Sequence, residues 1–270
     1  RIVNAYGETP EFVVLGGLVP DVLCSEALRQ HVGTTDIDVQ VDLEIRSGAG
    51  NAGRLELALR AAQFTPSGQY VWRWQDRSVL GAIIKIELLA DLSNAPAEAT
   101  VVFRGSESLG AVNLRGTGFA SRDWRPHRLI NDVSGQRTAV EVRVATLPAY
   151  LLAKTHAAYG RRLAKDFYDI AYVVLHNDAG GAAAAAERVR QVFPRDLLGQ
   201  TATALKELAA NFSDESAQGS LAYATTMQAL HPDLNADVLA NDMLADSRIA
   251  SDLPIRQSYG CRRRTGCRNG

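Results

Sequence analysis

The sequence TTDIDVQVD (residues 34–42) alternates carboxylate or amide side chains with apolar, mostly β-branched ones. This period of two is typical of a strand with one polar and one apolar face, and the alternation continues as far as Ile45. Asp36 and Asp38 therefore share one face of a predicted sheet. Two carboxylates at this spacing can hold one divalent cation or a pair of cations. An Asp-x-Asp pattern also occurs in solvated strands, so the flanking sequence decides between the two interpretations.

About twenty residues earlier, EFVVLGG (11–17) is a short apolar run that ends in a glycine pair. The run predicts a buried strand followed by a tight turn. Gly16 and Gly17 lack side chains and would let the backbone approach a phosphate group closely. The hydroxyl of Thr34 or Thr35 could donate a hydrogen bond to the same phosphate group. The alternative is that the glycine pair serves only as a turn.

The apolar run LGAIIKIELLAD (80–91) follows the aspartates and carries one carboxylate, Glu87, near its middle. We expect it to be a largely buried strand that forms a hairpin with YVWRW (70–74). Glu87 could join Asp36 and Asp38 as a third metal ligand. Oxygen ligands of this kind suit Mg²⁺ or Mn²⁺, which also bind nucleoside triphosphates. An exposed strand face is the alternative position for Glu87.

The rest of the first half alternates predicted helices with strands. Apolar spacing predicts helices over 20–33 and 51–64. Further strands are predicted at VVFRG (101–105), HRLIND (127–132) and TAVEVRVA (138–145), with the Gly-, Arg- and Ser-rich stretch 104–126 as a loop. The predicted fold class is therefore α/β (α+β), with a mixed β-sheet in the N-terminal part.

The character of the chain changes after residue 145. Thr146 and an early proline begin a predicted helix that runs to residue 176, and Gly180-Gly181 ends it. Three more helices follow, around 182–193, 202–212 and 236–247, separated by polar loops such as 213–220. We expect a catalytic domain at 1–145, a helical domain at 146–250 that completes the active site, and a disordered Arg-rich tail at 251–270.

The overall composition is that of an ordinary globular protein, with 46% hydrophobic and 22% charged residues. Five of the 29 basic residues lie in residues 255–270, which leaves 24 basic against 30 acidic side chains in residues 1–254. A globally basic nucleic-acid binder is not indicated, although a local basic groove is compatible with this balance. Three cysteines make neither a disulfide framework nor a zinc pattern, which favours a reducing, cytoplasmic setting. No apolar run reaches the length of a membrane span, so we expect no membrane partner.

Together, the glycine pair, the T-x-D-h-D-h pattern (h, hydrophobic) and the carboxylate on an apolar strand resemble the DNA polymerase β-like nucleotidyltransferases. The sequence KTHAAYGRRLAKDFYDI (154–170) narrows this resemblance. It is similar to the helical motif of the AbiEii/MenT group, the toxin halves of type IV-like toxin–antitoxin systems. The resemblance covers about residues 11–176 and implies a nucleotidyltransferase fold.

The resemblance also implies roles for particular residues. Its catalytic set is Asp36, Asp38, Lys154, Asp166, Asp169 and Thr34. Its nucleotide-binding set is Gly16, Gly17, Thr34, Thr35, Lys154 and Arg161, and its metal ligands are Asp36, Asp38 and Glu87. One aspartate of the Asp166/Asp169 pair would complete the active site, and Thr35 is an equally placed rival of Thr34.

The helical spacing independently supports a site on this part of the chain. Lys154, Ala157, Ala158 and Arg161 share one face of a helix, and the two alanines leave room for a ligand between two cationic side chains. Lys165 points away from this helix face and would be a surface residue or a contact to a tRNA. Among the histidines, His156 is the one that we would test, and the three tryptophans are read as core or edge-strand aromatics.

The resemblance implies a Mg²⁺- or Mn²⁺-dependent enzyme that transfers a nucleoside monophosphate from a nucleoside triphosphate (NTP) to RNA. The acceptor would be the 3′ end of a tRNA, whose extension blocks translation, and a cognate antitoxin is a possible partner. Two alternatives stay open: a small-molecule nucleotidyltransferase of the antibiotic-modifying kind, and a catalytically degenerate nucleotide-binding or antitoxin-interacting protein.

Overall fold

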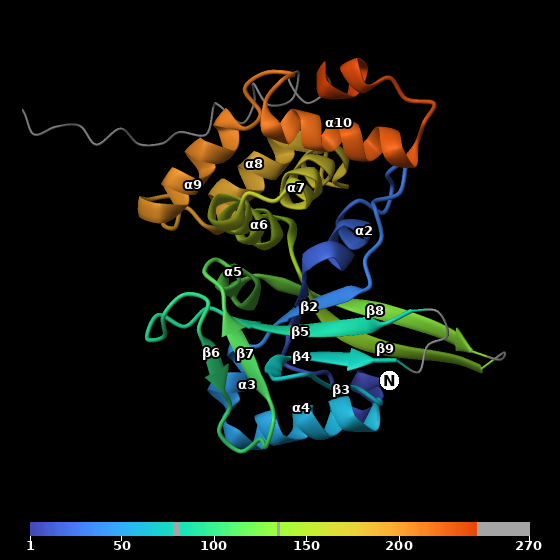
Figure 1. The fold of residues 1–270 in the computed structure, drawn as a ribbon, viewed down its shortest axis with the longest axis vertical. Helices are drawn as coiled ribbons and strands as arrows, with labels where there is room; N and C mark the ends of the chain where they lie inside the picture. Colours follow the sequence, from blue (N-terminus) through green and yellow to red (C-terminus); the bar gives the residue numbers. More distant parts are fainter. Residues whose placement is uncertain (78–81, 134–135, 242–270) are drawn as a thin grey trace, which may run out of the picture.

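A computed structural model describes residues 1–77, 82–133 and 136–241 of the chain. Within these residues, nine strands form one sheet in the order β3-β4-β5-β2-β1-β9-β8, with β7 pairing with both β5 and β6 (Figure 1). The pairs β1–β9, β2–β5 and β5–β7 are parallel and the others are antiparallel. The predicted α/β class with a mixed sheet is therefore confirmed.

The strands and helices have the following bounds. The strands are β1 (Val13–Leu15), β2 (Asp36–Gln40), β3 (Thr65–Ser67), β4 (Tyr70–Asp76), β5 (Ile84–Ala90), β6 (Thr100–Val102), β7 (Gly110–Asn113), β8 (Trp124–Val133) and β9 (Gln136–Ala145). The helices are α1 (Ile2–Tyr6), α2 (Val19–Leu23), α3 (Asp42–Ser47), α4 (Ala49–Ala61), α5 (Gly118–Arg122), α6 (Leu147–Arg161), α7 (Ala164–His176), α8 (Gly181–Val192), α9 (Gly199–Ala210) and α10 (Gln218–Leu230). A short 3₁₀ turn, η1 (Gly16–Leu18), joins β1 to α2.

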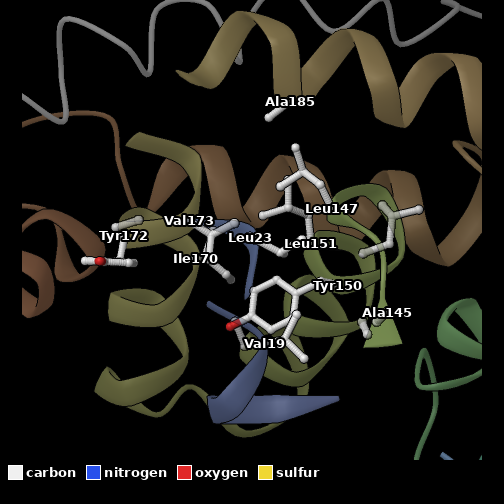
Figure 2. Close-up of a cluster of buried hydrophobic side chains, with 14 of the residues drawn as sticks. Val19, Leu23, Ala145, Leu147, Tyr150, Leu151, Ile170, Tyr172, Val173 and Ala185 are labelled. Carbon is white, nitrogen blue, oxygen red and sulfur yellow. The ribbon is translucent and has the colours of Figure 1, made fainter. Parts of the chain in front are cut away.

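Two layers of helices cover the sheet (Figure 1). Helices α6 to α10 lie together on one side, and α3 and α4 lie on the other. One buried core joins β1, β9 and α2 to α6 and α7, so the strands and the C-terminal helices share it (Figure 2). A second core packs α4 against the opposite face of β2, β4 and β5. The apolar residues of β2, Ile37 and Val39, face this second core, as the alternation predicts.

The predicted strand over 36–45 is wrong beyond Gln40. The side-chain oxygen Oε1 of Gln40 accepts a hydrogen bond from the backbone N–H of Asp42 at 3.0 Å, and helix α3 starts there. The alternating polar residues after Gln40 are therefore helical and buried with partners. Glu44, for example, accepts hydrogen bonds from the Tyr6 hydroxyl and the Glu11 backbone.

The predicted helix over 20–33 is wrong after its first turns. Helix α2 ends at Leu23, and the chain continues without regular structure to β2. The carboxylate of Asp178, just after α7, accepts hydrogen bonds from Ser25 and Glu26 and fixes the start of this segment. Leu28 is fully exposed, so the apolar spacing that predicts the helix is not a buried face.

The second half also differs from the predicted elements. The stretch 104–126 contains β7, α5 and the start of β8 instead of one loop. The predicted helix over 146–176 is two helices, because Arg162 adopts a left-handed conformation (φ 51°) that ends α6. Helix α10 begins inside the predicted loop 213–220. Residues 242–270, which include the predicted tail, lie outside the described residues.

Several other predicted elements fit the structure. The predicted helix over 236–247 is helical over 236–241, and its remainder lies outside the described residues. Helix α4 matches the prediction over 51–64, and β4 and β5 pair antiparallel as the predicted hairpin requires. In the described part of the chain, none of the helices combines the length and the apolar character that crossing a membrane requires.

Candidate active site

Four strands bring one residue each into a single row across the sheet. Asp38 on β2 pairs with Leu15 on β1 and with Glu87 on β5, and Glu87 pairs with Arg73 on β4. Asp38 and Glu87 are therefore neighbours on the face away from the α4 core. Both line a cavity of about 200 Å³ that Lys154, Ala157 and Arg161 of helix α6 close from above.

The glycine pair contacts the aspartate motif. Gly16 has a left-handed conformation (φ 75°), and a Cβ atom at this position would overlap the carboxylate of Asp38. A Cβ atom on Gly17 would lie 3.0 Å from Cγ2 of Thr34. Both glycines thus allow the turn after β1 to pack against the start of β2, and Gly16 also lines the cavity.

The side chain of Asp38 has neither a hydrogen bond nor an ion pair within the described residues. Burial raises the pKa of Asp38 to about 6, with Glu87 adding to the shift and Lys154 opposing it. Glu87 differs, because its Oε1 accepts a hydrogen bond of 2.7 Å from Arg73. The cavity floor therefore holds Asp38, whose carboxylate has no ion pair among the described residues, beside Glu87, whose carboxylate is paired with Arg73.

Asp36 and the two threonines lie outside the lining of this cavity. Asp36 Oδ1 lies 3.4 Å from Lys85 Nζ, and this oxygen atom is buried without a hydrogen bond to any described residue. The Thr34 hydroxyl accepts a hydrogen bond from the Asp36 backbone N–H at 3.1 Å, and Thr35 is exposed. The hydrogen bond of Thr34 fixes the start of β2, next to the cavity.

The opposite wall is a buried ionic network at the corner between α6 and α7. Lys154 Nζ donates to Asp169 Oδ2 at 2.6 Å and to Asp166 Oδ1 at 3.1 Å. Arg161 donates to both oxygens of Asp166, at 2.6 and 2.7 Å. Asp166 and Asp169 lie behind Lys154 and do not line the cavity. The break at Arg162 folds α7 back, which lets its aspartates reach Lys154.

Mutual charge holds this network ionised. Burial disfavours charge on Lys154, but Asp169 and Asp166 outweigh it and raise the pKa of this amine. Burial likewise disfavours charge on both carboxyls, but hydrogen bonds and nearby cations outweigh it and lower the pKa of Asp166 and of Asp169. A lysine has three N–H donors and two are used here, so one is left to face the cavity.

His31 is a member of this network that the sequence did not reveal. Its Nε2 lies 2.8 Å from Asp169 Oδ1, its ring stacks on Tyr168, and it meets Tyr172 edge-on. Because a carboxylate only accepts hydrogen bonds, Nε2 carries the proton in this contact. Nδ1 is buried and has no hydrogen-bond partner in the described part of the chain. His31 thus ties the irregular segment after α2 to helix α7.

A loop and a turn from the first half complete the cavity. Its further lining residues are Leu15, Leu89, Ala97, Glu98, Asn113, Leu114, Arg115, Thr117, Ala153 and His156. His156, singled out beside Lys154, hydrogen-bonds Thr201, and burial lowers its pKa. Ala158 is part of the apolar core instead, so Ala157 and Ala153 are the small residues at the cavity.

Asp38 and Glu87 could hold a magnesium ion as a pair of carboxylates. Within the described ranges, no group of three or more His, Cys, Asp or Glu side chains is placed to hold a metal. Mg²⁺ is commonly held by one or two carboxylates together with water and phosphate oxygens. Asp38, which forms no ion pair with another described residue, and its neighbour Glu87 could supply such a pair, with Asp36 two residues away on the same strand.

Comparison with known proteins gives one match. Residues 112–241 match the family model described as nucleotidyl transferase AbiEii toxin, type IV toxin–antitoxin system. The resemblance to the AbiEii group is thus confirmed, and the matching range contains the whole Lys154 network except His31. No curated protein and no solved structure matches the chain significantly.

Proposed function

We propose, from the match of residues 112–241 to a nucleotidyl transferase toxin family, that this chain is a metal-dependent nucleotidyltransferase toxin. It would transfer a nucleoside monophosphate from an NTP to the 3′ end of an RNA. The observation that carries the proposal is the cavity itself. Its floor presents the carboxylates Asp38 and Glu87 and its roof presents the cations Lys154 and Arg161.

In this proposal the triphosphate lies between roof and floor. Lys154 and Arg161 each keep N–H donors that Asp166 and Asp169 do not use, and charge-assisted hydrogen bonds to phosphate are among the strong ones. Gly16 leaves the backbone open beside Asp38. The apolar side chains of Leu15, Leu89 and Leu114 offer a surface for the ribose and base.

Asp38 and Glu87 would hold the Mg²⁺ ion, which would neutralise phosphate charge and favour ionisation of the acceptor hydroxyl. The residues of this chain orient the reactants: the row across the sheet fixes the carboxylates, and the buried network fixes the cations. Such prepositioned charge stabilises the charge that develops on the leaving pyrophosphate without reorganisation. The nucleotidyltransferase fold and the role of Asp36 as a further ligand belong to this proposal.

The acceptor class and the cellular role rest on family resemblance. A tRNA 3′ end would be the acceptor, its extension would block translation in the cytoplasm, and a type IV antitoxin would be the cognate partner. Two alternatives remain: transfer to a small antibiotic-like acceptor, and nucleotide binding without transfer.

One assay separates these functions. The purified protein is incubated with Mg²⁺, each labelled NTP in turn, and either total tRNA or an aminoglycoside, and the same is done with Asp38→Ala and Lys154→Ala. We expect label to enter tRNA with the unmodified protein alone. Label in the aminoglycoside would support the small-molecule enzyme, and NTP binding without transfer would support the degenerate protein.

A further inference from the structure

Two partly exposed aromatic rings lie at the start of β4, close to the cavity floor. Tyr70 is 44% exposed and Trp72 is half-buried, and their ring centres are 5.2 Å apart. They differ from Trp74 of the same strand, which is completely buried in the α4 core. Trp74 therefore covers the core, whereas Tyr70 and Trp72 present ring surface to solvent.

Arg73 connects these rings to the cavity floor. Its guanidinium lies 4.6 Å from the centre of the Trp72 ring and 5.7 Å from that of Tyr70. The same guanidinium donates to Glu87, which lines the cavity. Because Arg73 and Asp38 belong to one row with Glu87 between them, about two strand spacings, roughly 10 Å, separate their backbones.

Besides Arg73, two further cations lie toward the other end of β4. Arg77, directly after the end of β4, is exposed, and Lys85 on β5 lies opposite Gln75 in the pairing of β4 with β5. The carboxylates nearby, Glu87 and Asp36, lie beside Arg73 and Lys85 respectively. Exposed rings next to cations are the arrangement that binds single-stranded nucleic acids, since bases stack on the rings while phosphates approach the cations.

We infer that Tyr70, Trp72 and Arg73, with the nearby Arg77 and Lys85, form a surface that binds the single-stranded 3′ end of an RNA. This inference rests on the proposed function for its choice of RNA, and it adds which surface receives the acceptor. A base stacked on Trp72 would place the following 3′ hydroxyl toward Glu87 and the cavity. The surface would thus deliver the acceptor to the nucleotide from the β4 side of the sheet.

The test is the affinity for a short labelled single-stranded RNA with a free 3′ hydroxyl, measured by fluorescence anisotropy at one fixed salt concentration. The variants are Tyr70→Ala, Trp72→Ala and the conservative Trp72→Phe. Trp124→Ala is the matched control, because Trp124 is 37% exposed and lies 4.4 Å from the Arg143 guanidinium, but on β8 at the other end of the sheet. Circular dichroism establishes that each variant is folded.

We expect Trp72→Ala to weaken RNA binding about tenfold or more, which is the usual loss for one stacked base. Tyr70→Ala should also weaken binding, and Trp72→Phe should keep most of the affinity. Trp124→Ala should bind RNA like the unmodified protein. Unchanged affinity in both alanine variants of β4, or an equal loss in Trp124→Ala, would overturn the inference. Transfer to RNA is measured separately: RNA binding at Trp72 without any transfer refutes the proposed function, whereas transfer with undiminished binding refutes this surface.

Discussion

Lys154 on α6 donates a hydrogen bond of 2.6 Å to Asp169 on α7, and both side chains are buried. The contact spans a corner that the left-handed Arg162 creates between two helices. Removing one partner of a buried ion pair leaves the other charge buried without a counter-ion. The resulting loss of folding free energy usually exceeds the net contribution of the intact pair. The contact therefore joins the stability of the corner to the cation that faces the cavity.

Lys154→Met should lower the free energy of unfolding by about 3–5 kcal/mol, because Asp166 and Asp169 lose a shared cation in a buried place. Lys206→Met is the matched control, since Lys206 is exposed on α9, and it should change stability by less than about 0.5 kcal/mol. Urea unfolding of both variants measures the difference. Equal stabilities would show that the network is not an ionised unit.

His31→Leu should cost about 1–3 kcal/mol, because one oxygen of Asp169 then remains buried without its hydrogen bond. His31→Gln should recover most of this loss, since its amide can donate from nearly the position of Nε2. If His31 also positions Lys154 through Asp169, the KM for the NTP will rise in the leucine variant and return in the glutamine variant. A glutamine variant as unstable as the leucine variant would mean that ring packing on Tyr168 is what matters.

Gly16→Ala should abolish transfer and destabilise the fold by more than about 1 kcal/mol, because the new Cβ overlaps Asp38 and the backbone is left-handed. Gly33→Ala is the control, since a Cβ there meets nothing within 4 Å. Thermal unfolding and transfer assays compare the two. An active Gly16→Ala protein would contradict the close packing of the turn on Asp38.

Asp38→Asn should be more stable than the unmodified protein at pH 8 and equally stable at pH 4. The pKa of Asp38 is raised from 3.8 to about 6, so ionising it costs the folded state more than the unfolded state. The advantage of the variant should grow as the pH rises from about 4 to 6 and reach about 3 kcal/mol, because each pKa unit corresponds to about 1.4 kcal/mol. Urea unfolding across this pH range, without divalent cations, measures it, and a constant difference would contradict the shift.

The sequence predicts the site floor better than its roof. Asp38 and Glu87 come from strands, where alternation and order along the chain indicate which side chains share a face, and Gly16 comes from the turn directly after a predicted strand. The roof depends on a helix break at Arg162, and a left-handed arginine has no local signal comparable to a glycine. Without that break, Asp166 and Asp169 would lie more than two turns further along the same helix, far from Lys154.

Other differences have similar physical causes. The alternation beyond Gln40 fits a strand and a short helix with buried, bonded carboxylates equally well, and the Gln40 side chain decides for the helix. His31 lies on a segment without periodicity, so its pairing with Asp169, 138 residues away, follows from tertiary packing alone. The cavity wall at Thr117 likewise comes from the stretch 104–126, which the sequence predicts to be a loop.

In the proposed function, a nucleoside monophosphate is transferred to an RNA 3′ end in the cavity between Asp38 and Lys154. The most direct measurement is the mass of a defined RNA after incubation with Mg²⁺ and each NTP, together with the pyrophosphate released. We predict an increase by whole nucleoside monophosphate units, one pyrophosphate for each unit, and neither change with Asp38→Asn. An RNA of unchanged mass with every NTP, or an equal extension by folded Asp38→Asn, would contradict the account.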